Sequence, residues 1–182
     1  MPRVPQLSTR DQVSPEQLSV FERLAGAYGH VQGPSSVLLH SPDICERVFE
    51  VSSYLRFKGK IALEQVEWII LAVARERNSK FVWADHLAPA RKAGVREEYI
   101  DAVRAKRAPE GLTSNEADVY RYVQQLVTHS TCDAALFDRL KARWSVPCLM
   151  EMTTLIGCYL MLGVVAGAVE IPLRPTDEVL PD

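Results

Sequence analysis

The amino-acid sequence predicts an all-α protein with a single core, and three observations support this. Helix-starting signals recur along the chain, and between them apolar residues recur at intervals of three or four positions. No segment between turn signals alternates apolar and polar residues as a half-buried strand would. At 182 residues, of which 47% are hydrophobic, the chain can bury one substantial core but is too short for two ordinary domains.

Most of the predicted helices begin or end at a recognisable capping sequence. The Ser-Pro-Glu-Gln sequence at 14–17 forms a capping box with proline at the first helical position, and Thr113 forms another with Glu116. Residues 29–34, with two glycines and a proline, predict a break, and Gly94 predicts a helix end. The predicted helices span residues 15–28, 42–58, 63–76, 80–93, 97–105, 113–128 and 132–144, followed by a long apolar helix from about residue 146.

The last predicted helix contains a stretch of eighteen residues without a formal charge, Met152–Val169. This length reaches the threshold for a membrane-spanning helix. However, Glu151 and Glu170 bracket the stretch, and no lysine or arginine flanks it closely. We therefore expect a helix buried inside an oligomer and no membrane span. Gly163 and Gly167 are four positions apart, a spacing that lets another helix approach closely.

Charge and cysteine content argue against several classes of partner. A formal net charge of −2 gives no basic surface for nucleic acid or an anionic membrane. The N-terminus lacks the apolar stretch of a signal peptide, and the four cysteines are scattered without zinc-binding spacing. We therefore expect reduced thiols in a cytoplasmic protein, with no metal site. No nucleotide-binding motif occurs, so the sequence predicts no cofactor.

One central stretch carries a more specific pattern. Residues 62–95 read ALEQVEWIILAVARERNSKFVWADHLAPARKAGV. Glu67 is followed nineteen residues later by His86, which opens an H-x-x-x-A-x-x-x-G run through Ala90 and Gly94. This pattern resembles the core motif of the carboxymuconolactone decarboxylase family. The resemblance implies an alkylhydroperoxidase-D-like helical bundle that assembles as a homo-oligomer, a trimer or a hexamer.

On this resemblance, which extends over most of the chain, the sequence divides into three parts. Residues 1–35 form an N-terminal extension with one helix, and residues 36–173 form the carboxymuconolactone decarboxylase-like helical domain. Residues 174–182 form a C-terminal tail with two prolines and three acidic residues. We expect this tail to be mobile or to lie across a partner.

The chain departs from the peroxidase branch of the family at two positions. In that branch a C-x-x-C pair ends four residues before the histidine, where this chain has Ser79 and Val82. Peroxide reduction by that route needs a thiolate of low pKa and a second thiol to close a disulfide. No cysteine lies within thirty residues of His86. We therefore do not expect thiol peroxidase activity.

Glu67 and His86 form a candidate catalytic pair. A histidine can accept or donate a proton near neutral pH, and a carboxylate can carry a proton or hold the imidazole in one tautomer. If the chain folds back at residues 78–79, the two positions are offset by roughly 6 Å along the helices, which a side chain or one water can bridge. Two alternatives remain open. Glu67 could instead pair with a nearby cation (Arg75, Arg77 or Lys92), and His86 could be a core histidine.

Further residues could complete a substrate pocket. Arg56 could clamp a substrate carboxylate, although a surface salt bridge is its more common role. His40 precedes a predicted helix and could point into the pocket, or could simply be a loop residue. Aromatic side chains could form the walls, although aromatic residues at helical spacing more often belong to the core; the candidates are Tyr54, Trp83 and Tyr159.

Two functions from different classes are consistent with these residues. The resemblance implies a cofactor-independent decarboxylase, or a related lyase or isomerase, that acts on a small carboxylated lactone or aromatic-derived acid. In that enzyme His86 would be the proton donor and Glu67 its partner. The alternative is a non-catalytic member that keeps the oligomeric helical scaffold and binds a small ligand. Convergence of Glu67 and His86 in a mostly apolar cavity would favour the enzyme.

Overall fold

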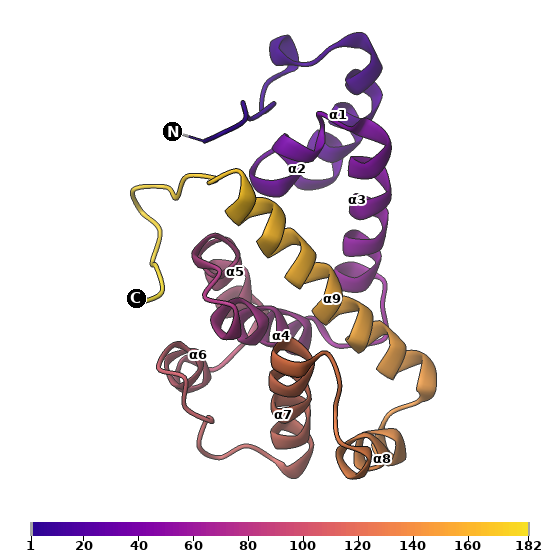
Figure 1. Cartoon of the computed structure of the whole chain (residues 1–182), viewed down its shortest axis with the longest axis vertical. Helices are drawn as coiled ribbons and strands as arrows, with labels where there is room; N and C mark the ends of the chain where they lie inside the picture. Colours follow the sequence, from indigo (N-terminus) through magenta and orange to yellow (C-terminus); the bar gives the residue numbers. More distant parts are fainter. Residues whose placement is uncertain (1, 182) are drawn as a thin grey trace.

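The computed structural model describes residues 2–181, and Figure 1 shows its arrangement. Within this range the chain is helical without a strand, which confirms the predicted all-α class. Helices α1–α3 gather at one end of the molecule, α7 and α8 lie at the other, and α9 runs diagonally between them (Figure 1). The elements in chain order are η1 (Arg10–Gln12), α1 (Pro15–Tyr28), α2 (Gly33–Leu38), α3 (Pro42–Phe57), α4 (Leu63–Glu76), α5 (Lys80–Ala93), α6 (Glu97–Arg104), α7 (Ser114–His129), α8 (Ala134–Arg143) and α9 (Val146–Ala168).

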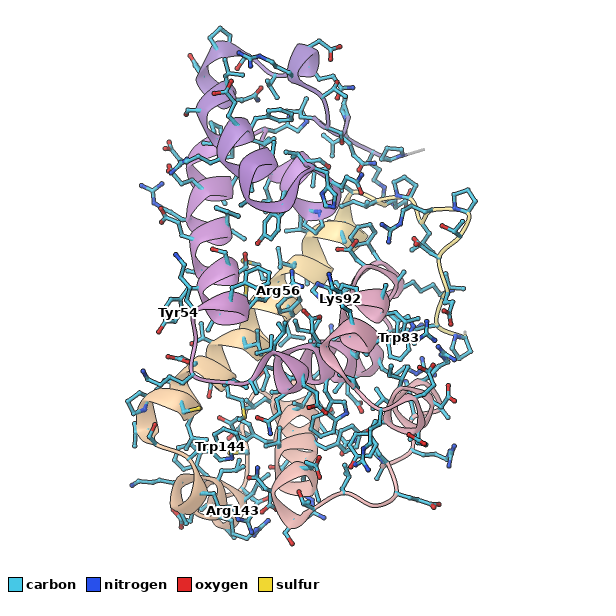
Figure 2. All side chains as sticks on the ribbon, turned by 180° about the vertical axis from the view of Figure 1, so that it is seen from behind. Tyr54, Arg56, Trp83, Lys92, Arg143 and Trp144 are labelled. Atoms are coloured by element: carbon cyan, nitrogen blue, oxygen red, sulfur yellow. The ribbon has the colours of Figure 1, made fainter. Side chains whose placement is uncertain are left out.

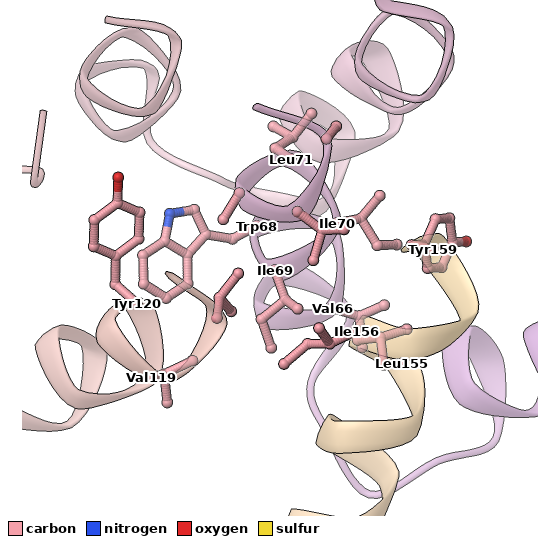
Figure 3. Close-up of a cluster of buried hydrophobic side chains, with 14 of the residues drawn as sticks. Val66, Trp68, Ile69, Ile70, Leu71, Val119, Tyr120, Leu155, Ile156 and Tyr159 are labelled. Atoms are coloured by element: carbon pink, nitrogen blue, oxygen red, sulfur yellow. The ribbon is translucent and has the colours of Figure 1, made fainter. Parts of the chain in front are cut away.

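Helix α4 forms the centre of the main core because its sequence is apolar on almost every face. Every residue from 66 to 75 is buried, and helices α5, α6, α7 and α9 pack around them. Figure 3 shows Trp68 stacked on Tyr120 of α7, with ring centroids 6.0 Å apart, and Leu155 and Ile156 of α9 on another side of the helix. Close packing of this kind holds α4 in one position. A polar group on this helix is therefore fixed in space.

The first three helices pack around a second, smaller hydrophobic cluster, here named the N-terminal cluster. It is separate from the main core, and the two are joined where α2 and α3 contact α9 and where α3 contacts α4. The two clusters therefore meet along a seam. The buried members of the N-terminal cluster are Leu7, Val20, Phe21, Leu24, Val31, Leu39 and Cys45.

Helices α4 and α5 have the predicted bounds, whereas α2 is absent from the prediction. The predicted break over residues 29–34 is wrong in its last part, because Pro34 lies in the first turn of α2. Proline is favoured there since its missing N–H needs no partner in a first turn. Val37 of α2 packs against Ala166 and Ile171, far away in the sequence. This helix thus depends on contacts that local sequence signals do not report.

The C-terminal tail lies back against the molecule over residues 174–181, with contacts inside the chain that the sequence did not predict. Glu178 forms ion pairs with Arg91 of α5 and Arg104 of α6. Leu180 is buried and belongs to the main core. Figure 1 shows the tail running from the end of α9 past α5 toward α6. One of the acidic residues of the tail, Glu178, thus provides ion pairs with the domain.

Helix α9 is the longest helix and packs against both clusters. By length and composition alone it is the one helix within residues 2–181 that could cross a membrane. It contacts α2, α3, α4, α5, α7 and α8, although only 39% of its most apolar 18-residue window is buried. Gly163 serves a contact inside the chain, because a Cβ there would lie 3.1 Å from the Oγ of Ser79. A Cβ at Gly167 would meet no neighbour within 4 Å.

Gly33→Ala is expected to lower the free energy of unfolding by about 1–3 kcal/mol. Gly33 has a φ of +58°, which disfavours any residue with a Cβ, and that Cβ would lie 2.7 Å from Cζ of Phe81. The matched control is Gly26→Ala inside α1, where a Cβ has no neighbour within 4 Å. The control should stabilise by roughly 0.5–1 kcal/mol because alanine favours helix. Urea denaturation measures the change in the free energy of unfolding for both variants. Equal changes would contradict the backbone conformation of Gly33 and its close approach to Phe81.

Candidate active site

The α4–α5 hairpin brings a carboxylate and an imidazole together. Asn78 adopts a left-handed backbone conformation at the turn, with φ of +51°, and α5 packs back along α4. Glu67 lies on α4 and His86 on α5, on the faces that meet. The Nδ1 atom of His86 lies 2.7 Å from Oε2 of Glu67. The turn therefore produces a direct hydrogen bond between two residues nineteen positions apart.

Arg56, in the last turn of α3, binds the other oxygen of the same carboxylate. Its Nε and Nη2 atoms donate hydrogen bonds to Oε1 of Glu67, at 3.1 and 2.6 Å. The side chain of Glu67 is 1% exposed and that of Arg56 is 17% exposed. Arg75, a possible alternative partner, bonds instead to Asn78 and to the backbone of Arg104. Both oxygens of Glu67 are thus engaged by residues of other helices.

This arrangement determines which nitrogen of His86 can exchange a proton. Burial alone would raise the pKa of the Glu67 carboxyl, but the hydrogen bonds and charges of His86 and Arg56 outweigh it and hold that pKa below its ordinary value. An ionised carboxylate only accepts hydrogen bonds, so Nδ1 of His86 carries a hydrogen. The Nε2 atom is left as the nitrogen that can take up or release a proton.

Tyr159 of α9 packs against the imidazole. The rings of Tyr159 and His86 meet edge to face, with centroids 4.9 Å apart. Tyr159 is 4% exposed, and burial raises the pKa of its hydroxyl well above the ordinary value. The hydroxyl therefore stays neutral and can donate a hydrogen bond. Figure 3 shows it pointing away from the main-core side chains of α4.

A cavity of about 130 Å³ lies at the seam between the N-terminal cluster and the main core. Its walls are mostly apolar or aromatic, and it is reached by Arg56, His86 and Tyr159. An apolar cavity of about 150 Å³ can hold one benzene ring, so this one suits a single-ring ligand. The apolar and aromatic walls include Leu24, Tyr28, Leu38, Phe49, Phe81 and Leu162.

Three residues that the sequence suggested for the substrate pocket lie away from the cavity. The Nε2 atom of His40 is 2.9 Å from the carbonyl oxygen of Pro5 and thereby ties down the N-terminal segment. Tyr54 lies at the outer edge of α3 (Figure 2), and its hydroxyl donates to Glu151 at 2.9 Å. Trp83 is fully buried in the main core. The structure thus places Trp83 in the core role that aromatic residues at helical spacing more often have.

Several cavity-lining residues gave no signal in the sequence. Tyr28 ends α1, His30 lies in the loop that follows, Phe49 is on α3 and Phe81 is near the start of α5. They come from separate segments that only tertiary packing brings together. The single local hint is Gly29, which marks a helix end, and loops beside helix ends commonly carry binding residues.

The sulfur atoms of the chain are poorly suited to peroxide chemistry. Ser79 precedes α5, and Val82 is buried at the cavity wall. Of the four cysteines, Cys45 lines the cavity, and burial raises the pKa of its thiol to about 11. Such a thiol is protonated at neutral pH and is a weak nucleophile. Among residues 2–181, no three His, Cys, Asp or Glu side chains are grouped so that they could hold a metal ion.

The comparison with protein families identifies the same central region. The model of the carboxymuconolactone decarboxylase family matches residues 42–125, which contain Arg56, Glu67 and His86. No curated protein matches the chain.

Solved structures share the fold at low sequence identity. An alkylhydroperoxidase AhpD core protein, an uncharacterized peroxidase-related protein from Ralstonia eutropha JMP134, has a TM-score of 0.76 and 15% identity, over 96% of this chain and 93% of that chain. An uncharacterized peroxidase-related protein from Silicibacter sp. TM1040 has a TM-score of 0.72 and 16% identity, over 96% and 94%. A protein of unknown function from Agrobacterium tumefaciens, described as a candidate AhpD antioxidant defence protein, has a TM-score of 0.65 and 18% identity, over 79% and 100%.

At such identities the structural likeness shows the fold alone, and the family assignment depends on the central segment. That segment carries the Glu67–His86 spacing, and it is the part that the family model matches. Residues 42–125 therefore match the carboxymuconolactone decarboxylase family, and the chain has an AhpD-like helical fold.

Proposed function

We propose that this protein is a cofactor-independent enzyme, a decarboxylase or a related lyase or isomerase, that acts on a small carboxylated lactone or aromatic-derived acid. The observation that carries the proposal is the hydrogen-bonded series Arg56–Glu67–His86 beside a mostly apolar cavity. A buried ion pair contributes little to stability once the desolvation of its charges is counted. A buried carboxylate with a perturbed pKa, hydrogen-bonded to a histidine at a cavity wall, is typical of catalytic sites.

In this proposal Arg56 holds the carboxylate of the substrate. Its Nε and Nη2 atoms are occupied by Glu67, whereas Nη1 makes no hydrogen bond within residues 2–181. The guanidinium can therefore donate to a ligand in the cavity while it remains paired with Glu67. Glu67 balances the charge of Arg56, and Asp85, which also lines the cavity, pairs with Arg174. A protonated His86 would therefore add the positive charge that an anionic substrate requires.

His86 supplies the proton. When a carboxylate leaves as carbon dioxide, the electron pair of the broken C–C bond moves into a conjugated carbonyl group. Protonated His86 then donates from Nε2 to carbon, while Glu67 at Nδ1 stabilises the imidazolium before transfer. In an isomerisation, the same nitrogen removes a proton from one carbon and returns it to another. Neither reaction requires an oxidant or a reductant.

A screen of carboxylated lactones and aromatic carboxylic acids tests this function, with released carbon dioxide and isomerised product as the two readouts. We expect turnover of at least one single-ring acid. We also expect Arg56→Lys to raise KM for that acid, because lysine cannot form the forked contact with Glu67 and bind the substrate as well. Arg47→Lys, on an exposed side of α3, is the matched control. If no acid in the panel yields either carbon dioxide or an isomerised product, the proposal is contradicted.

We further propose that the protein acts as a homo-oligomer, a trimer or a hexamer. Helices α3 and α9 leave a shallow apolar groove uncovered, lined by Val51, Tyr54 and Met150 among others. Light scattering should give three or six times the chain mass of 20.4 kDa, and Met150→Lys should lower that mass. Val179→Lys, at a similarly exposed apolar position on the tail, is the control. A single-chain mass for the unaltered protein would contradict this proposal.

A further inference from the structure

The hydroxyl of Tyr159 is a polar group at the cavity wall that no protein group engages within residues 2–181. Tyr159 is 4% exposed, yet its hydroxyl makes no hydrogen bond within residues 2–181. Among the other tyrosines of the main core, the Tyr122 hydroxyl lies 2.8 Å from Oγ1 of Thr153 and Tyr99 donates to a backbone oxygen at 3.3 Å. Tyr120 makes no hydrogen bond within residues 2–181, but unlike Tyr159 it does not line the cavity. A hydroxyl at a cavity wall that no protein group engages is available to donate a hydrogen bond to the occupant of the cavity.

The position of this hydroxyl is defined by its neighbours. Tyr159 lines the cavity together with Arg56 and His86, and its ring packs edge to face on the imidazole. The three side chains come from α9, α3 and α5, and each offers a different chemical group. Arg56 is a fixed cation, His86 is a proton carrier, and Tyr159 is a neutral donor. All three border one space that is large enough for a single ring.

We propose that the Tyr159 hydroxyl donates a hydrogen bond to the oxygen on which negative charge collects during the reaction. The inference rests on the proposed function and adds a catalytic residue to the same site. Preorganised donors aimed at a developing oxyanion are among the largest contributions to enzymatic rate. Arg56 and His86 do not provide a hydrogen bond to this oxyanion, because Arg56 binds the carboxylate and His86 transfers the proton.

The step balances without any further reactant. The C–CO₂ bond breaks and its electron pair moves through the conjugated system to the carbonyl oxygen, which becomes an enolate oxygen. Tyr159 keeps its proton and donates only a hydrogen bond to that oxygen. The electron pair then returns to carbon, which takes a proton from Nε2 of His86, and solvent reprotonates the imidazole. In an isomerisation the same enolate forms after proton removal, so the role of Tyr159 is identical.

Binding of 4-nitrophenolate tests the proposal without a known substrate. This probe is a planar single ring whose oxygen carries delocalised negative charge, as in the enolate, and its absorbance reports a change in hydrogen bonding. We expect the unaltered protein to bind it with a shifted spectrum. Tyr159→Phe should weaken binding by about tenfold to a hundredfold, because a hydrogen bond to a charged oxygen is lost. The spectral shift should shrink in parallel.

Two controls separate a hydrogen bond from a change in packing. Tyr122→Phe removes the hydroxyl of another buried tyrosine that does not line the cavity, and should leave binding unchanged. Nitrobenzene has the ring without the anionic oxygen, and should bind equally to the unaltered protein and to Tyr159→Phe. The proposal is overturned if the unaltered protein does not bind 4-nitrophenolate. It is also overturned if Tyr159→Phe weakens the binding of 4-nitrophenolate and nitrobenzene equally. If the phenolate results hold but no acid in the panel is turned over, the donor assignment stands and the proposed reaction fails.

Discussion

His86→Ala is expected to lower turnover by about two to four orders of magnitude, the usual contribution of a positioned proton-transfer group. The effect should fall on kcat, because the substrate carboxylate is still held by Arg56 while the proton carrier is absent. The variant should stay folded, since Glu67 keeps its hydrogen bonds to Arg56 when the imidazole is removed. Release of carbon dioxide or product from the acid identified by the screen measures the effect.

The chain offers a matched control for this variant. His40 hydrogen-bonds the backbone of Pro5 and lies away from the cavity, so His40→Ala should keep the turnover of the unaltered protein. Circular dichroism of both variants shows whether the helices are retained. Full turnover by a folded His86→Ala protein would remove the basis for an acid–base mechanism at this site.

Glu67→Ala is expected to lower the free energy of unfolding by about 3–5 kcal/mol, the usual result of removing one member of a buried ion pair. The substitution leaves the guanidinium of Arg56 largely buried without its carboxylate, and it leaves Nδ1 of His86 without an acceptor. Urea denaturation of the folded variant measures the loss. Activity should fall as well, because the imidazole is no longer held in one tautomer.

An exposed ion pair provides the comparison for Glu67. Glu22 pairs with Arg10 at the surface, where both side chains are more than half exposed. Glu22→Ala should therefore change the free energy of unfolding by only about 0–1 kcal/mol. Similar losses for Glu22→Ala and Glu67→Ala would mean that the Arg56–Glu67 contact is not buried in solution.

The α4–α5 hairpin could be predicted from the sequence because its signals are local. Apolar periodicity gave the helices, the turn at residues 78–79 reversed the chain, and the spacing of Glu67 and His86 then allowed their contact. The offset of roughly 6 Å expected from helix rise is covered by the two side chains, which meet at 2.7 Å. When a contact depends only on one turn and two regular helices, the geometry of the helices is enough to predict it from the sequence.

The rest of the site depends on how helices that are distant in the sequence pack against one another. Their packing cannot be predicted from local sequence patterns. The pairing of Arg56 with Glu67 requires the end of α3 to meet the middle of α4. Tyr28 reaches the cavity because α1 packs on α3, where its ring meets Phe49. Tyr54 and Arg56 are two positions apart on one helix, yet only Arg56 faces the cavity. Composition and spacing do not distinguish the two faces of α3.

The seam between the N-terminal cluster and the main core has a consequence for how this architecture can diversify. The matched family segment begins at residue 42, whereas Leu24, Tyr28 and Leu38 of the cavity wall precede it. In the proposed enzyme, part of the ring-binding wall therefore precedes the stretch of polypeptide that carries the proton-transfer pair. Grafting a different first forty residues onto α3–α9 would reshape that part of the cavity wall and leave the carboxylate–imidazole contact in place.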